Sequence, residues 1–176
     1  MGRSRWSLGT AQSDRLLEEQ VSSRYHRSVQ RTEARVESAA ALPPSGEHPI
    51  IFFDGVCVLC NGFIDRMLRA DRGGIFRFAP LQGETARTLL PPQDDDPLRW
   101  SLLYRDEHGV HAQSDAALEI CRRLGGAWAM LSLLRLAPRR LRDAVYRLVV
   151  RNRYRWFGQR ATCRVPSPAE RARFLR

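Results

Sequence analysis

Lysine is absent from this chain of 176 residues, so all 29 of its basic residues are arginine. Long apolar runs are also absent. Residues 127–137, AWAMLSLLRLA, fall short of the roughly 18 to 20 residues that span a membrane, and they include Arg135. The first ten residues, MGRSRWSLGT, lack the apolar segment of a signal peptide. We therefore expect neither a membrane-spanning nor a secreted protein, but a soluble and cytoplasmic one.

Cysteine is scarce, with four residues in the chain. Four cysteines without a signal peptide do not suit a secreted disulfide framework. A structural zinc site usually takes two close cysteine pairs, or one cysteine pair and one histidine pair. Only Cys57 and Cys60 form such a pair, and the histidines show no ligand spacing apart from His108 and His111. Zinc is therefore the weaker alternative, and we expect no bound metal or cofactor.

Acidic residues are few in the C-terminal third, although the net charge of the whole chain is +10. From Cys121 onward there are 15 arginines against two acids, a net of +13, whereas the first 120 residues carry −3. Such a basic region can bind nucleic acid or an anionic membrane, but arginines on the solvated faces of helices give the same count. We favour solvated faces, keep a weak contact with an anionic membrane surface as a partner, and do not expect nucleic acid.

Composition divides the chain into three parts. Residues 1–46 are rich in Ser, Arg, Glu and Gln and run into the hinge ALPPSGEHP, so we expect a flexible or partly helical leader. Residues 47–125 alternate strand and helix patterns, and residues 126–176 read as a basic helical extension packed on the same domain. An apolar residue recurs every four positions in the leader, at Leu17, Val21, Tyr25 and Val29.

The middle part predicts an α/β domain with the element order β-α-β-α-β-β-α. Short apolar or alternating runs favour strands, and stripes of apolar residues ended by Gly or Pro favour helices. The expected strands are 49–53, 75–81, 100–104 and 109–113, and the expected helices are 57–70, 83–90 and one capped by Ser114.

The C-terminal part predicts helices at about 127–137 and 139–151, and a last one that begins at SPAE, where Ser167 and Glu170 suit a capping box. In the second helix the expected inward residues are apolar, namely Leu141, Val145, Leu148 and Val149. The segment RNRYRWFG (151–158) has a composition suited to phosphate contact and base stacking. We favour a structural corner instead, with its arginines in water and its aromatic residues packed inward, namely Tyr154, Trp156 and Phe157.

The pair in FFDGVCVLCN (52–61) lies where a buried strand turns into an amphipathic helix. A thiolate at a helix N-terminus is stabilised by the macrodipole and free N–H groups, which lower its pKa from about 8.5 to roughly 3.5 to 7.5. Cys60 follows Cys57 by three positions on the same side, so the two can form a disulfide. We predict that an exposed Cys57 attacks a substrate disulfide and that a buried Cys60 resolves the mixed disulfide.

Two alternatives to a redox pair are a metal half-site and two small core residues, and the redox hypothesis outweighs both. Two roles are open for Asp54. Its carboxylate could accept the proton of Cys60, or the residue could stabilise the turn and cap the helix. The runner-up function is a redox-silent binding module whose basic helices dock on an anionic membrane or nucleic acid.

The motif FFDGVCVLCNGFIDRMLRAD resembles the signature of the DCC family of thiol-disulfide oxidoreductases. The blocks FRFAPLQGETAR, QSDAALEICRRLGGAW and LAPRRLRDAVYRLVVRNRYRWFG, and the cysteine of ATC, extend the resemblance over about 48–165. It implies a thioredoxin-like three-layer α/β fold with a mixed sheet of about four strands and a helical C-terminal extension. Asp54, Cys57 and Cys60 are then the motif residues.

The dithiol cycle requires partners, for which we expect a disulfide-containing protein or low-molecular-weight thiol as substrate and an unidentified reductant or oxidant. Pro97, or else Pro80, is the nearest candidate for the substrate-facing proline of thioredoxins. Cys121, on the apolar face of a helix, is expected to be structural. Cys163 is either a third redox thiol near the pair or a free loop thiol.

Overall fold

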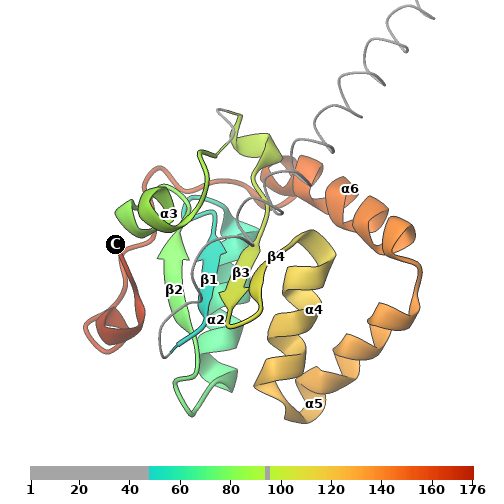
Figure 1. Ribbon diagram of the computed structural model, residues 1–176. Helices are drawn as coiled ribbons and strands as arrows, with labels where there is room; N and C mark the ends of the chain where they lie inside the picture. The colour runs from blue at the N-terminus through green and yellow to red at the C-terminus, as the bar shows by residue number, and fades with distance from the viewer. Residues whose placement is uncertain (1–47, 94–95) are drawn as a thin grey trace, which may run out of the picture. The chain divides into compact units, whose positions relative to one another are not determined.

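A mixed sheet of four strands organises residues 48–93 and 96–176, which the computed structural model describes (Figure 1). The strands are β1 (Ile50–Phe53), β2 (Arg77–Pro80), β3 (Leu103–Asp106) and β4 (Gly109–Ala112). Their order is β2-β1-β3-β4, with β1 parallel to β2 and antiparallel to β3, and β3 antiparallel to β4. This mixed α/β arrangement confirms the expected fold class and is compatible with a thioredoxin-like fold. The predicted leader lies outside the described residues.

Helices cover both faces of the sheet, which gives three layers (Figure 1). Helices α2 (Val58–Ala70) and α4 (Gln113–Leu124) pack on one face, and α3 (Glu84–Leu89) packs on the other. The remaining elements are α5 (Gly126–Ala129), α6 (Arg139–Phe157) and the 3-10 helices η1 (Pro97–Arg99), η2 (Met130–Leu136) and η3 (Arg171–Arg173).

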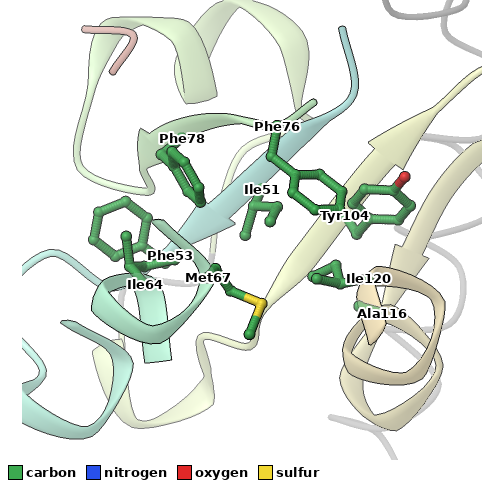
Figure 2. Close-up of a cluster of buried hydrophobic side chains, with 9 residues drawn as sticks. All are labelled: Ile51, Phe53, Ile64, Met67, Phe76, Phe78, Tyr104, Ala116 and Ile120. Atoms are coloured by element: carbon green, nitrogen blue, oxygen red, sulfur yellow. The ribbon is translucent and has the colours of Figure 1, made fainter. Parts of the chain in front are cut away.

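Strand β1 is apolar at every position because both of its faces are buried. Successive side chains point to opposite faces, so Ile51 and Phe53 join the cluster between the sheet and helices α2 and α4, shown in Figure 2. Ile50 and Phe52 join the cluster under α3. The strand therefore fixes the position of the residues that follow it, Asp54 to Cys57, at the end of a rigid core.

The end of α2 is held by a buried carboxylate. Asp71 accepts hydrogen bonds from the backbone N–H of Ile75 at 2.9 Å and of Phe76 at 3.0 Å, and it pairs with Arg173. The next residue, Phe174, packs edge-on against the ring of Phe53, with the centroids 6.2 Å apart. The C-terminal segment is thus tied to both β1 and the loop that leads into β2.

Most element boundaries agree with the sequence, and the exceptions have local causes. Strand β3 begins at Leu103, three residues later than expected. The 3-10 helix η1 occupies residues 97–99, and residues 100–102 connect it to the strand. Helix α4 begins one residue before Ser114, whose hydroxyl bonds Asp143 and the Nη1 of Arg142 instead of capping the helix. The stretch 126–136 forms α5 and η2 rather than one helix.

The predicted last helix is replaced by a shorter structure. Glu170 does accept the backbone N–H of Ser167 at 2.9 Å, which is half of the expected capping box. No α-helix follows, and the segment makes only the 3-10 turn η3 before it pairs with β2 through Leu175, whose N–H donates to the carbonyl of Phe78 at 2.8 Å.

The orientation predicted for the second C-terminal helix is wrong. Leu141, Val145 and Leu148 of α6 are exposed by 59%, 55% and 57%, and of the four expected inward residues Val149 alone is half-buried. The opposite side of the helix faces the domain, where the hydroxyl of Tyr146 accepts the N–H of Leu102 at 2.9 Å. The polar contacts of this inward side, described below, hold the helix with its apolar stripe facing solvent.

The cap at Asp71 yields a stability prediction. Asp71→Ala removes the acceptor of one buried and one partly buried N–H group and the partner of Arg173, so we expect the free energy of unfolding to fall by about 2 to 4 kcal/mol. Urea unfolding followed by circular dichroism measures it. The control Glu84→Ala removes an exposed carboxylate and should change the value by less than about 0.5 kcal/mol. Equal losses in the two variants would contradict the capping role.

Candidate active site

The cysteine pair lies at the start of α2, as predicted. Cys57 is the N-cap residue, and its Sγ accepts the backbone N–H of Cys60 at 3.2 Å. The backbone carbonyl of Cys57 accepts the N–H of Asn61 at 3.0 Å, which opens the helix. A sulfur therefore occupies the place of the hydroxyl or carboxylate that usually caps a helix, where a thiolate is favoured.

The two thiols have opposite acidities. The hydrogen bond from the Cys60 thiol lowers the pKa of Cys57 to about 7, against burial, with further help from the Cys60 N–H and from the positive charge of Arg153. The pKa of Cys60 is raised, first because its proton is held in that hydrogen bond and second because it is buried. Cys57 is thus the acidic thiol and Cys60 the protonated one, in the order that their predicted roles require.

The predicted exposure of the two thiols is reversed. Cys57 has no solvent exposure, whereas Cys60 is half-buried. The cause is residues 158–164, which we call the strap and which run beside the Asp54–Cys57 loop. Strap hydrogen bonds join the Arg160 N–H to the carbonyl of Val56 at 2.8 Å, and the N–H of Val58 to the carbonyl of Gly158 at 3.4 Å.

Asp54 is 3% exposed, and its carboxylate accepts four hydrogen bonds. Its Oδ1 accepts from the N–H of Val56 at 3.2 Å and from the Nε2 of Gln82 at 2.8 Å. Its Oδ2 accepts from the Nη2 of Arg153 at 3.1 Å and from the hydroxyl of Tyr154. Two donors on each oxygen leave little room for a proton from Cys60, so the contacts favour a positioning role.

Arg153 is a site residue that the sequence did not reveal. It is 1% exposed, although the arginines of RNRYRWFG were expected in water. Its guanidinium also donates to the carbonyls of Pro97 at 2.5 Å, Val150 at 3.0 Å and Trp100 at 3.3 Å. Of the three aromatic residues expected to pack inward, Tyr154 does so and bonds Asp54, whereas Trp156 and Phe157 are 52% and 46% exposed. The structural corner exists, but its inward anchor is the arginine.

Asn61 is a second residue that was missed. It is fully buried, and its Nδ2 donates to the carbonyl of Cys57 at 2.7 Å and of Gly55 at 2.9 Å. Its side chain therefore clamps the loop that carries the acidic thiol. The only sequence signal was a polar residue on the buried side of α2, directly after the pair.

Residues 51–159 match the model of the DCC1-like thiol-disulfide oxidoreductase family. The chain belongs to that family. The matched residues include the Asp54–Cys60 motif, the sheet and α6, and a general thiol-disulfide oxidoreductase role follows from the family.

Two relatives agree with this assignment. A Bacillus subtilis (strain 168) protein named "Uncharacterized protein YuxK" is 37% identical over 127 residues, which cover 72% of this chain and 93% of that protein. The "DCC family protein At1g52590, chloroplastic" of Arabidopsis thaliana is 31% identical over 131 residues, covering 73% and 76%. No solved structure matches the chain.

The other expected residues of this DCC1-like protein lie in different places. Cys163, in the strap, lies so close to Gly55 that a Cβ built there would be 2.1 Å from its Sγ. Burial raises the pKa of Cys163, and its role as a third redox thiol stays a prediction. Cys121 is buried in α4. Pro80 ends β2 opposite Phe53, and the described residues contain no cis peptide bond.

Two further absences concern the described residues alone. Within 48–93 and 96–176, no group of three or more His, Cys, Asp and Glu side chains is arranged to hold a metal ion. No helix of the same residues is long and apolar enough to cross a membrane.

The low pKa of Cys57 predicts the order and pH dependence of alkylation. In the reduced protein we expect Cys57 to react with iodoacetamide along a titration curve centred near pH 7, because only the thiolate is nucleophilic. Burial under the strap lowers the absolute rate but does not move the midpoint. Peptide mapping at several pH values gives the curve for each cysteine. A midpoint for Cys57 at or above 8.5 would contradict the site geometry.

The charges beside the pair predict opposite shifts in two variants. Arg153→Met removes the cation that lowers the pKa of Cys57, so the alkylation midpoint should rise; Asp54→Asn removes the anion that raises it, so the midpoint should fall. Arg155→Met, two positions along α6 and exposed, is the matched control and should leave the midpoint unchanged. Circular dichroism checks that each variant folds. Shifts in the same direction for both site variants would exclude this electrostatic account.

Proposed function

We propose that the chain reduces or forms disulfides by thiol-disulfide exchange, with Cys57 as the attacking thiol and Cys60 as the resolving thiol. The observation that carries the proposal is the Sγ of Cys57 at the N-cap of α2, where it accepts the Cys60 N–H and has a pKa of about 7. About half of this thiol is then ionised at neutral pH, against about 1% at a pKa of 9.

In the reducing direction, the Cys57 thiolate attacks one sulfur of a substrate disulfide, and the other substrate sulfur leaves as a thiolate. Cys60 then loses its proton and attacks the Sγ of Cys57. The second substrate thiol is released, the Cys57–Cys60 disulfide forms, and two electrons have passed to the substrate. A thiol or dithiol reductant must restore the pair, and the reverse sequence oxidises a substrate dithiol.

Asp54 supports this cycle as a positioning residue. It joins the loop before Cys57 to α6 through Arg153 and Tyr154 and to the segment after β2 through Gln82. The raised pKa of Cys60 still requires a base for the second step. The leaving thiolate of the substrate is released next to the pair and can take that proton without Asp54.

Access to Cys57 requires a local movement of the strap. Its sulfur is covered, and the cover is held by three backbone hydrogen bonds, at the buried Gly55, the half-buried Val56 and the exposed Val58. Breaking a few hydrogen bonds of one segment costs less free energy than global unfolding. We therefore place disulfide substrates, from proteins or low-molecular-weight thiols, between the strap and the start of α2.

Single cysteine variants test the order of attack. With a disulfide substrate such as insulin or oxidised glutathione, Cys60→Ser should accumulate a mixed disulfide on Cys57, because no thiol remains to resolve it. Cys57→Ser should lose turnover and trap nothing. Intact mass spectrometry and peptide mapping identify the adduct.

Cys121→Ser is the matched control, since it removes a buried thiol of α4 and should retain turnover. An adduct on Cys60 in the Cys57→Ser variant would reverse the two roles, in line with the greater exposure of Cys60. Full turnover by Cys57→Ser would exclude the proposed cycle altogether.

A further inference from the structure

Helix α6 packs on the domain with its apolar stripe facing solvent. Leu141, Val145 and Leu148 follow one another at the spacing of a single helix face, and each is more than half exposed. The side that faces the domain carries Tyr146 and Arg153, both engaged in hydrogen bonds. Figure 1 shows α6 along the outside of the fold. Soluble surfaces rarely leave such a stripe uncovered unless it serves an interaction.

Further exposed apolar side chains lie in η2, which precedes α6 by two residues. Its exposed side chains are Met130 at 68%, Leu133 at 62%, Leu134 at 58% and Leu136 at 87%. We call these residues, together with Leu141, Val145 and Leu148, the apolar face. All seven side chains of the apolar face are more than half exposed, whereas the strands of the sheet are largely buried.

Positive charge accompanies the apolar face. Arg140 and Arg155 are exposed, lie beside the stripe on α6, and pair with no carboxylate among the described residues. From Cys121 to the end the chain has only two acids, Asp143 and Glu170. Asp143 is held by Ser114 and Arg139, and Glu170 by Arg164. Eight of the 15 arginines in this region pair with carboxylates outside it, so the charge available to a partner beside the stripe comes from Arg140 and Arg155.

The combination of charge and apolar side chains selects among possible partners. A second copy would bring the same positive charge against this face, which opposes self-association. A nucleic acid would contact the arginines but leave the leucines uncovered. The 47 residues that precede the described part contain seven arginines and six acids, so they offer no complementary charge.

We propose that the apolar face docks on an anionic lipid surface, with α6 lying in the plane of the interface. Amphipathic helices bind in this way when leucine and valine enter the boundary between headgroups and acyl chains while arginines contact the lipid phosphates. This is peripheral binding of a folded domain. It does not depend on the redox chemistry of Cys57 and Cys60. Helix α6 would contact the membrane with its outer side and the thiol site with its inner side.

Vesicle flotation with the full chain tests the proposal. The wild type should bind vesicles that contain phosphatidylglycerol and phosphatidylcholine, bind pure phosphatidylcholine weakly, and dissociate as salt is raised. Leu141→Gln with Leu148→Gln should reduce the partition constant at least about tenfold, because two apolar side chains no longer enter the interface. Arg140→Gln should reduce it about fivefold, the equivalent of about 1 kcal/mol.

Matched controls lie outside the apolar face. Val165→Gln replaces a valine that is 82% exposed, and Arg72→Gln replaces an exposed arginine after α2; both should bind like the wild type. All these positions are at the surface, so the variants should fold, and circular dichroism verifies it.

Three results would overturn the proposal. One is equal binding by the leucine variant and the wild type, with loss only in Arg140→Gln and tight binding to duplex DNA, which would indicate a nucleic-acid surface. Another is a dimer in analytical ultracentrifugation that Leu141→Gln with Leu148→Gln dissociates. The third is no binding to anionic vesicles by a monomeric wild type. The redox assays are independent of all three.

Discussion

The structure depends on one buried ion pair, between Asp54 at the end of β1 and Arg153 in α6, 99 positions later in the chain. Both side chains are at most 3% exposed, and removing two charges from water costs several kcal/mol per ion unless their hydrogen bonds are replaced. Here they are replaced, since both oxygens of Asp54 have two donors and the Arg153 Nη atoms reach three carbonyls. Such a pair is costly to break, because either partner alone would be an uncompensated charge.

The ion pair explains two features that conflict with the usual rules of burial. It turns the polar side of α6 inward and so leaves Leu141, Val145 and Leu148 in contact with solvent. It also brings the end of α6 next to the cysteine loop, so that the strap continues directly over Cys57. The covered thiol and the uncovered apolar stripe therefore have the same origin. A helix that packed by its leucines would turn Arg153 away from Asp54.

The parts of this arrangement that the sequence predicted are those determined locally. The strand, the Asp-Gly turn and the position of Cys57 at the first turn of a helix follow from patterns within 20 residues, and the element order follows from several such patterns in series. The orientation of α6 does not, because hydrophobic periodicity identifies a stripe but not the element that it faces. With 15 arginines and two acids in the last third, no spacing distinguishes Arg153 from its neighbours as the partner of Asp54. The exposure of Cys57 was wrong for the same reason, since its cover comes from residues about 100 positions away.

The acidity of the thiol and access to it are thus controlled by different parts of the chain. The hydrogen bond from Cys60 is the largest cause of the lowered pKa of Cys57, whereas Arg153 and Asp54 are smaller causes that act in opposite directions. The acidity of Cys57 is therefore determined mainly within the CxxC turn. Access depends on the strap, which α6 and its ion pair hold in place. The same helix carries part of the apolar face, namely Leu141, Val145 and Leu148, on its outer side. An interaction at this face would therefore act on the helix that positions the strap over Cys57. It need not alter the pKa of either thiol.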